Sequence, residues 1–188
     1  YVGNEEWWDV AIIDARNQDS LSRTFLGISG FSYGLSTQDT ILLVGTGGSF
    51  KLYNVSTPAL PVYLCGVSLP DWILGITPAG SVAFVVTSDS GVYTIDISNL
   101  AQPQITGRMR RRVQTQTGVY NGVLNGQHMF VPYSTGVLIV DKSQTDSLRE
   151  EVFFPTGGSA VRVAIKDSLV FVASGLAGLW VLDISNPQ

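Results

Sequence analysis

The chain has 188 residues, of which 45% are hydrophobic and only 14% are charged, a composition that agrees with a globular body of packed sheets. Its formal net charge of −4 argues against a nucleic-acid-binding protein. No apolar stretch approaches 18 residues without polar or turn residues, so the sequence predicts no membrane span. The single cysteine, Cys65, cannot form an internal disulfide, and we expect it to be a small apolar filler.

In chain order, the predicted elements are short strands rich in Val, Ile, Tyr, Phe and Thr, separated by Gly, Pro, Asn, Asp and Ser. No segment shows helical periodicity with caps. The chain begins in what reads as the second strand of a unit, and later units divide into four strands each. The strands expected in the three central units are 31–38, 41–47, 49–55 and 61–67; 72–78, 82–88, 91–97 and 103–109; and 117–126, 129–134, 136–142 and 149–155.

The third strand of each unit repeats one pattern: an apolar run, one closing Asp or Asn, and a polar turn. The five copies read WDVAIIDARN, SFKLYNVST, GVYTIDISN, GVLIVDKSQ and GLWVLDISN, and they close at Asp14, Asn54, Asp96, Asp141 and Asp183. Three copies carry a Gly five residues before the closing position: Gly91, Gly136 and Gly178. A fixed period of about 40–45 residues indicates an array of one small structural unit. We interpret the closing column as structural, because a strand-end Asp can accept a hydrogen bond from the following turn.

Four strands in each unit of about 40–45 residues are typical of a β-propeller blade, which must stack on neighbours to bury its faces. We therefore expect an all-β, single-domain propeller of four-stranded antiparallel blades over 1–188. The expected repeats are approximately 1–29, 30–68, 69–110, 111–155 and 156–188. Since the repeats at both ends lack strands, we expect a segment of a larger propeller. A five-bladed ring with one reduced blade is the alternative.

The repeats resemble the LVIVD-repeat family of β-propellers. Val137, Leu138, Ile139, Val140 and Asp141 nearly spell the motif, and GVYTIDISN and GLWVLDISNP match its strand and turn. The first two copies depart from it: WDVAIIDARN lacks the leading Gly, and Asn54 stands where Asp is usual. The resemblance implies a bacterial or archaeal surface or exported protein. Because members of the family share no reaction, it implies a fold more than a function.

One cluster of charges falls where an expected outer strand crosses over to the next inner strand. It contains Arg108, Arg110, Arg111 and Arg112. Equivalent crossovers contain Phe31 and the pair Asp71 and Trp72, so these residues could meet at one rim of the propeller. Arginine suits anionic groups, and aromatic rings suit sugars or cations. The alternative is a solvated charged loop with Trp72 packed between blades.

Other polar candidates are sparse. His128 is the only histidine, and we expect a solvated turn residue there. We expect no metal site, because a zinc site needs several His or Cys ligands, and no cofactor. The pairs Asn121-Gly122 and Asn125-Gly126 are expected turns.

Three classes of function follow. The first is a non-catalytic structural or protein-interaction module, extracellular or on the cell surface, whose partner is another protein or further blades of the same polypeptide. The second is a glycan- or anion-binding module that uses the crossover rim. The third is an enzyme with its site at the channel mouth, which would need a polar constellation that this sequence does not display.

Overall fold

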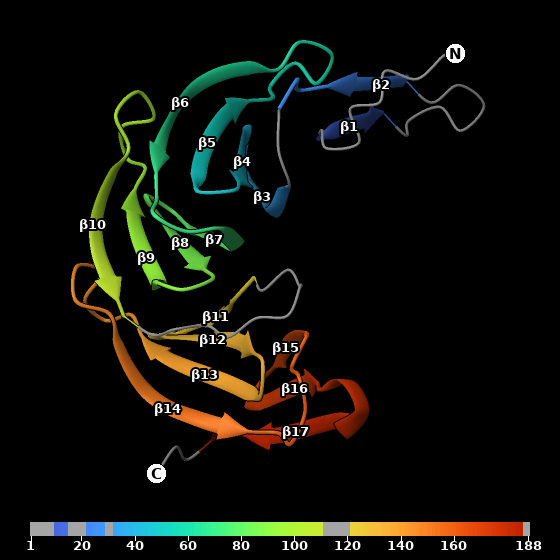
Figure 1. Cartoon of the computed structure of the whole chain (residues 1–188), viewed down its shortest axis with the longest axis vertical. Coiled ribbons are helices and arrows are strands. Elements are labelled where there is room, and N and C mark those ends of the chain that lie inside the picture. The colour runs from blue at the N-terminus through green and yellow to red at the C-terminus, as the bar shows by residue number, and fades with distance from the viewer. Residues whose placement is uncertain (1–9, 15–21, 29–31, 111–120, 186–188) are drawn as a thin grey trace.

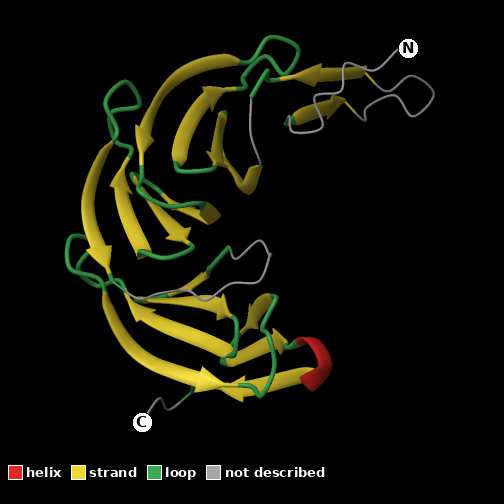
Figure 2. Cartoon of the chain, in the orientation of Figure 1, coloured by secondary structure: helices red, strands yellow, loops and turns green. Residues whose placement is uncertain are grey.

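The computed structural model describes residues 10–14, 22–28, 32–110 and 121–185, and these residues form an all-β structure (Figures 1 and 2). This confirms the all-β part of the predicted fold. The one helical element in these ranges is a short 3-10 turn, η1 (Gly175–Ala177). No helix within these ranges is long and apolar enough to cross a membrane.

The strands in the described part of the chain form five antiparallel sheets, which we number in chain order. Sheet 1 pairs β1 (Ala11–Asp14) with β2 (Ser22–Phe25). Sheet 2 contains β3 (Ser32–Gln38), β4 (Ile41–Thr46), β5 (Ser49–Asn54) and β6 (Val62–Ser68). Sheet 3 contains β7 (Ile73–Ala79), β8 (Val82–Thr87), β9 (Gly91–Asp96) and β10 (Gln104–Met109). Sheet 4 contains β11 (Val123–Asn125), β12 (His128–Tyr133), β13 (Gly136–Asp141) and β14 (Arg149–Pro155). Sheet 5 contains β15 (Arg162–Lys166), β16 (Leu169–Ala173) and β17 (Leu179–Asp183).

The five sheets follow one another around an arc (Figure 1). Strands β6, β10 and β14 lie on its convex outside, and β3 and β7 lie toward its inside. Because neighbouring strands are antiparallel, all crossovers from an outer strand to the next inner strand lie at the same ends of the strands. We call the side of the sheets that these strand ends form the crossover edge. The closing Asp and Asn residues lie at the opposite edge, the turn edge.

Hairpins at the turn edge join the first two strands of sheets 2 to 5 through two-residue loops. The first loop residue has a positive φ each time: 53° at Asp39, 65° at Gly80, 55° at Gly126 and 54° at Asp167. This left-handed conformation matches the twist of the two strands, and it favours Gly, Asn or Asp. The turn expected at Asn125-Gly126 is therefore present.

The core formed by the described residues consists of four apolar layers, one between each pair of successive sheets. We call the side of a sheet that faces the next sheet along the chain its forward face, and the other side its backward face. Phe50, Val92 and Val137 occupy one column on the forward faces of sheets 2, 3 and 4, and each is 0% exposed. The nearly continuous apolar third strands are thus explained, because both of their faces are buried against neighbouring sheets.

Each described outer strand after sheet 1 carries a β-bulge at the same place. One residue there has no partner in the pairing register: Leu64 in β6, Thr106 in β10 and Glu151 in β14. A bulge bends the strand and redirects the side chain of the extra residue. Figure 1 shows these outer strands curving around the arc.

Candidate functional site

At the turn edge, the closing residues bind the turns that follow them. The side-chain Oδ1 atoms of Asn54, Asp96, Asp141 and Asp183 accept hydrogen bonds from the backbone N–H groups of Ser56, Ser98, Ser143 and Ser185, at 2.8 to 2.9 Å. These backbone bonds are the main reason that the pKa values of the three carboxyl groups lie below their usual range, and bonds to the serine side chains lower them further. Strand β1 ends at Asp14, but the side chain of Asp14 lies outside the described part of the structure.

At the crossover edge, the structure brings two aromatic rings together. Trp72 lies just before β7 and is 48% exposed, and its ring centroid is 5.9 Å from that of Tyr33 on β3. The carbonyl oxygen of Trp72 accepts a hydrogen bond from the N–H of Ser88 at 3.0 Å. Beside it, Asp71 is partly buried, and its Oδ2 atom is buried without a hydrogen-bond partner among the described residues.

Arg108 contacts residues of its own sheet. It lies within β10, and its Nε donates a hydrogen bond to the carbonyl oxygen of Ser90 at 3.0 Å. Its guanidinium carbon is 5.1 Å from the centroid of the Tyr93 ring, a cation–π arrangement. Arg110 is exposed just beyond the end of β10. Phe31, Arg111 and Arg112 lie outside the described residues, so the predicted arginine cluster is seen here only in part.

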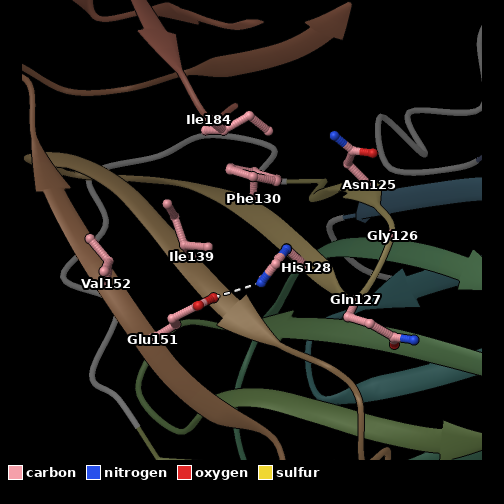
Figure 3. A pocket seen from close by; sticks show the side chains of 9 residues that line it. All are labelled: Asn125, Gly126, Gln127, His128, Phe130, Ile139, Glu151, Val152 and Ile184. Atoms are coloured by element: carbon pink, nitrogen blue, oxygen red, sulfur yellow. Dashed lines mark ion pairs between the residues drawn. The ribbon is translucent and has the colours of Figure 1, made fainter. Parts of the chain in front are cut away.

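A second candidate site lies at the turn edge, in a pocket between sheets 4 and 5 (Figure 3). Its volume is about 480 Å³. Its lining residues are Asn125, Gly126, Gln127, His128, Phe130, Ile139, Glu151, Val152 and Ile184. Strands β12, β13 and β14 of sheet 4 supply most of the wall, and Ile184, just after β17, closes it from sheet 5.

His128 and Glu151 face each other in this pocket (Figure 3). The Nε2 atom of His128 is 2.9 Å from Oε2 of Glu151, and the two side chains are 34% and 40% exposed. The His128 ring also meets the Phe130 ring edge-on, with centroids 6.4 Å apart. The expected solvated turn residue is therefore half-buried and paired with a carboxylate.

Sequence reasoning missed this pair because the two residues are 23 positions apart and neither belongs to a recognised motif. The one signal was a departure from the repeat. The residues that begin the second strands of sheets 2, 3 and 5 are aliphatic (Ile41, Val82 and Leu169), whereas β12 begins with His128. A polar residue at a position that is apolar in the other sheets indicates a local role beyond packing.

Among the residues that the structure describes, no group of three or more His, Cys, Asp or Glu side chains gathers in a way that could hold a metal ion. His128 and Glu151 alone provide two ligands, fewer than a usual zinc site. Since Nε2 of His128 already donates to Glu151, their arrangement can instead offer the remaining lone pairs of the carboxylate to a hydrogen-bond donor of a ligand.

Comparison with known proteins adds a family and a fold. The family model of the LVIVD repeat matches residues 78–110 and 157–188, which confirms the resemblance predicted from the sequence. No curated protein matches the chain.

Two crystal structures of computationally designed proteins resemble this one. Ika4 has a TM-score of 0.63 and 13% sequence identity, with 85% of this chain and 95% of Ika4 covered. Ika8 has a TM-score of 0.63 and 12% identity, with 93% of this chain and 55% of Ika8 covered. The chain thus spans about half the length of Ika8. At these identities the likeness shows the fold alone.

Proposed function

Taking the LVIVD repeats at two places in this chain as the premise, we propose that the five sheets are blades of a β-propeller that serves as a non-catalytic protein-interaction module. The module is extracellular or on the cell surface, in line with the resemblance to LVIVD proteins. Its partner binds the forward face of sheet 5 and is a further sheet of the same kind.

One observation carries the proposal. Leu179 occupies in sheet 5 the column of Phe50, Val92 and Val137, which are each 0% exposed, yet Leu179 is 68% exposed. Val181, on the same face of β17, is 51% exposed. An apolar residue is thus buried by the next sheet at three equivalent positions and exposed at the fourth. We infer that the exposed apolar face of sheet 5 is a surface for contact with another sheet.

We expect the purified 188-residue chain to associate in a concentration-dependent way through this face. Light scattering coupled to size-exclusion chromatography measures the mass of the native chain and of a Leu179→Asn/Val181→Thr variant. Because the variant removes apolar area from the forward face of sheet 5, it should shift the mass toward the monomer.

Leu60→Asn is the matched control, since Leu60 is 73% exposed but lies in the loop after β5, away from the stacking faces. This variant should associate like the native chain. A native chain that stays a monodisperse monomer at all concentrations would refute the proposed interaction surface.

A glycan-binding module is the second candidate, and the Trp72–Tyr33 pair is the observation that favours it. Two neighbouring rings at the crossover edge, one of them half exposed, suit the apolar face of a sugar. A glycan-array screen of the native chain against Trp72→Ala tests this candidate. Signals that disappear in the variant would support it, and an array without signals would remove it.

A further inference from the structure

We propose that the pocket between sheets 4 and 5 binds a small uncharged molecule that carries an apolar ring or chain and one hydroxyl group. This site lies at the turn edge, and it is distinct from both the forward face of sheet 5 and the aromatic pair at the crossover edge. The proposal does not depend on the function proposed above.

The shape and lining of the pocket suit a small ligand. Its volume of about 480 Å³ falls in the range of small-molecule sites, roughly 300–1,000 Å³. Phe130, Ile139, Val152 and Ile184 provide an apolar wall, and His128 and Glu151 converge on one side of it (Figure 3). Largely apolar lining with a few convergent polar groups is the usual composition of a ligand site.

The repeat shows that the polar pair is not needed to build a sheet. The position of His128 is occupied by Ile41 in sheet 2 and by Val82 in sheet 3. The bulge position of Glu151 is occupied by Leu64 and Thr106 in the same two sheets. A half-buried imidazole–carboxylate pair costs desolvation free energy that an aliphatic pair avoids. The sheet 4 pair is therefore explained better by a ligand than by folding.

The bulge in β14 is what makes the pair possible. Glu150 pairs with Val140 and Val152 pairs with Ile139, so Glu151 has no partner in the register. Its carboxylate is thereby placed 2.9 Å from Nε2 of His128. Bulges next to binding sites commonly redirect a side chain in this way.

The hydrogen-bond acceptors that remain free on Glu151 select the ligand class. The Nε2–H of His128 already donates to Glu151, so what the pair offers to a ligand is the remaining lone pairs of the carboxylate, which need a hydrogen-bond donor. A hydroxyl group can donate to the carboxylate, whereas a ligand carboxylate only accepts, and an ammonium group would place a second charge against largely apolar walls, which costs more desolvation free energy than burying a hydroxyl. The remaining walls are apolar, so the rest of the molecule should be apolar too.

A ligand-observed NMR titration with 1-naphthol and its methyl ether, 1-methoxynaphthalene, tests the proposal on the full chain. The ether has nearly the same apolar body but cannot donate a hydrogen bond. We expect 1-naphthol to bind about tenfold more tightly, as is typical for one hydrogen bond to a charged group. Glu151→Leu, which restores the residue type of sheet 2, should abolish this preference.

Two further variants locate the site. Ile139→Trp fills the pocket and should weaken the binding of both probes at least tenfold. Leu179→Asn alters only the forward face of sheet 5 and should leave both affinities unchanged. If Glu151→Leu fails to fold, Glu151→Thr takes its place with the same expected loss of preference, since threonine is the residue that sheet 3 carries at this bulge position.

The proposal is overturned if neither probe binds at concentrations up to about 1 mM, since small-molecule sites of this kind bind in or below that range. It is equally overturned if the preference for 1-naphthol survives the loss of the Glu151 carboxylate. Loss of binding in Leu179→Asn with normal binding in Ile139→Trp would assign the probes to the exposed sheet face, and would also overturn it.

Discussion

A single side-chain oxygen holds the turn after each of the third strands in sheets 2 to 5. The bond runs from the backbone N–H of the second following residue to Oδ1 of Asn54, Asp96, Asp141 or Asp183. An amide serves as well as a carboxylate in this geometry, because both offer the same oxygen. The departure from Asp at position 54 therefore preserves the turn but removes its charge.

This difference predicts how stability depends on pH. The pKa values of Asp96, Asp141 and Asp183 in the folded chain lie below the ordinary value of 3.8. Their contribution to the free energy of unfolding is complete above the unfolded-state pKa, and it is lost as the pH falls through the lower, folded-state pKa. We expect Asp96→Asn/Asp183→Asn to flatten the loss of stability in acid. Urea unfolding measured between pH 7 and pH 2 checks this, with the native chain as the reference.

Asn54→Asp is the converse control. It introduces a carboxylate into the one described turn of this column that lacks it, so acid should destabilise this variant more steeply than the native chain. Equal pH slopes for the native chain, the double Asn variant and Asn54→Asp would show that the ionised form of these carboxylates does not stabilise the fold more than the protonated form.

At the scale of the strand, the Gly column before the third strands has two physical causes. Gly91 and Gly178 adopt positive φ values of 96° and 78°, which L side chains rarely adopt. Gly136 has no positive φ, but a Cβ there would lie 2.1 Å from the carbonyl oxygen of Phe154 on the neighbouring strand. The same glycine is therefore required for two reasons. In sheets 3 and 5 it allows a positive φ, and in sheet 4 it lets the neighbouring strand approach closely.

We expect Gly136→Ala to lower the free energy of unfolding by about 1–3 kcal/mol, since backbone of β13 or β14 must move to make room. Gly80→Ala is the comparison, because Gly80 has a φ of 65° and open space around its Cβ position. Its cost should be about 1–2 kcal/mol and should arise from backbone strain alone. Guanidinium unfolding measures both free energies.

Crystal structures of the two variants separate these causes. In Gly136→Ala, β13 and β14 should be displaced from each other. In Gly80→Ala, the surroundings should not move. Undisturbed strands in Gly136→Ala would contradict the steric explanation.

Strand positions could be predicted from the sequence because alternation, turn residues and repetition are local signals. The expected strands at 41–47 and 82–88, for example, appear as β4 and β8. Bulges could not be predicted, since the extra residue differs in each sheet, from Leu64 to Thr106 to Glu151. For that reason the contact between Glu151 and His128 was beyond sequence reasoning.

At the scale of the whole molecule, Asn121 connects three sheets. Its Oδ1 accepts a hydrogen bond from the N–H of Ile76 at 2.9 Å, and its Nδ2 donates one to the carbonyl oxygen of Leu35 at 3.4 Å. The sequence indicated only a turn at Asn121-Gly122, because nothing local reports a contact 86 residues away. The same limit applies to the crossover edge, where Trp72 meets Tyr33, while Arg108 contacts its own sheet.

Asn121→Ala should therefore destabilise the chain by about 1–3 kcal/mol, the cost of leaving a buried donor without a partner. The donor is the N–H of Ile76, whose side chain is fully buried. Hydrogen exchange followed by NMR should show faster exchange of the Ile76 amide. Asn121→Asp keeps the acceptor and should restore most of the protection. Unchanged exchange in Asn121→Ala would mean that the three sheets hold together without this bridge.

Each sheet has a forward and a backward face, so the two ends of the stack of sheets present different surfaces. This difference limits how copies of the chain can assemble with one another. Sheet 5 exposes Leu179 and Val181 on its forward face, and sheet 1 exposes Ile13 and Phe25 on its backward side. These surfaces differ, so copies joined through them would meet head to tail rather than about a two-fold axis. Head-to-tail contacts either close into a ring or continue as a filament. If a few copies with a substitution at one of these two surfaces were mixed with native copies, each would therefore stop the growth of an assembly in one direction and leave the other end able to grow.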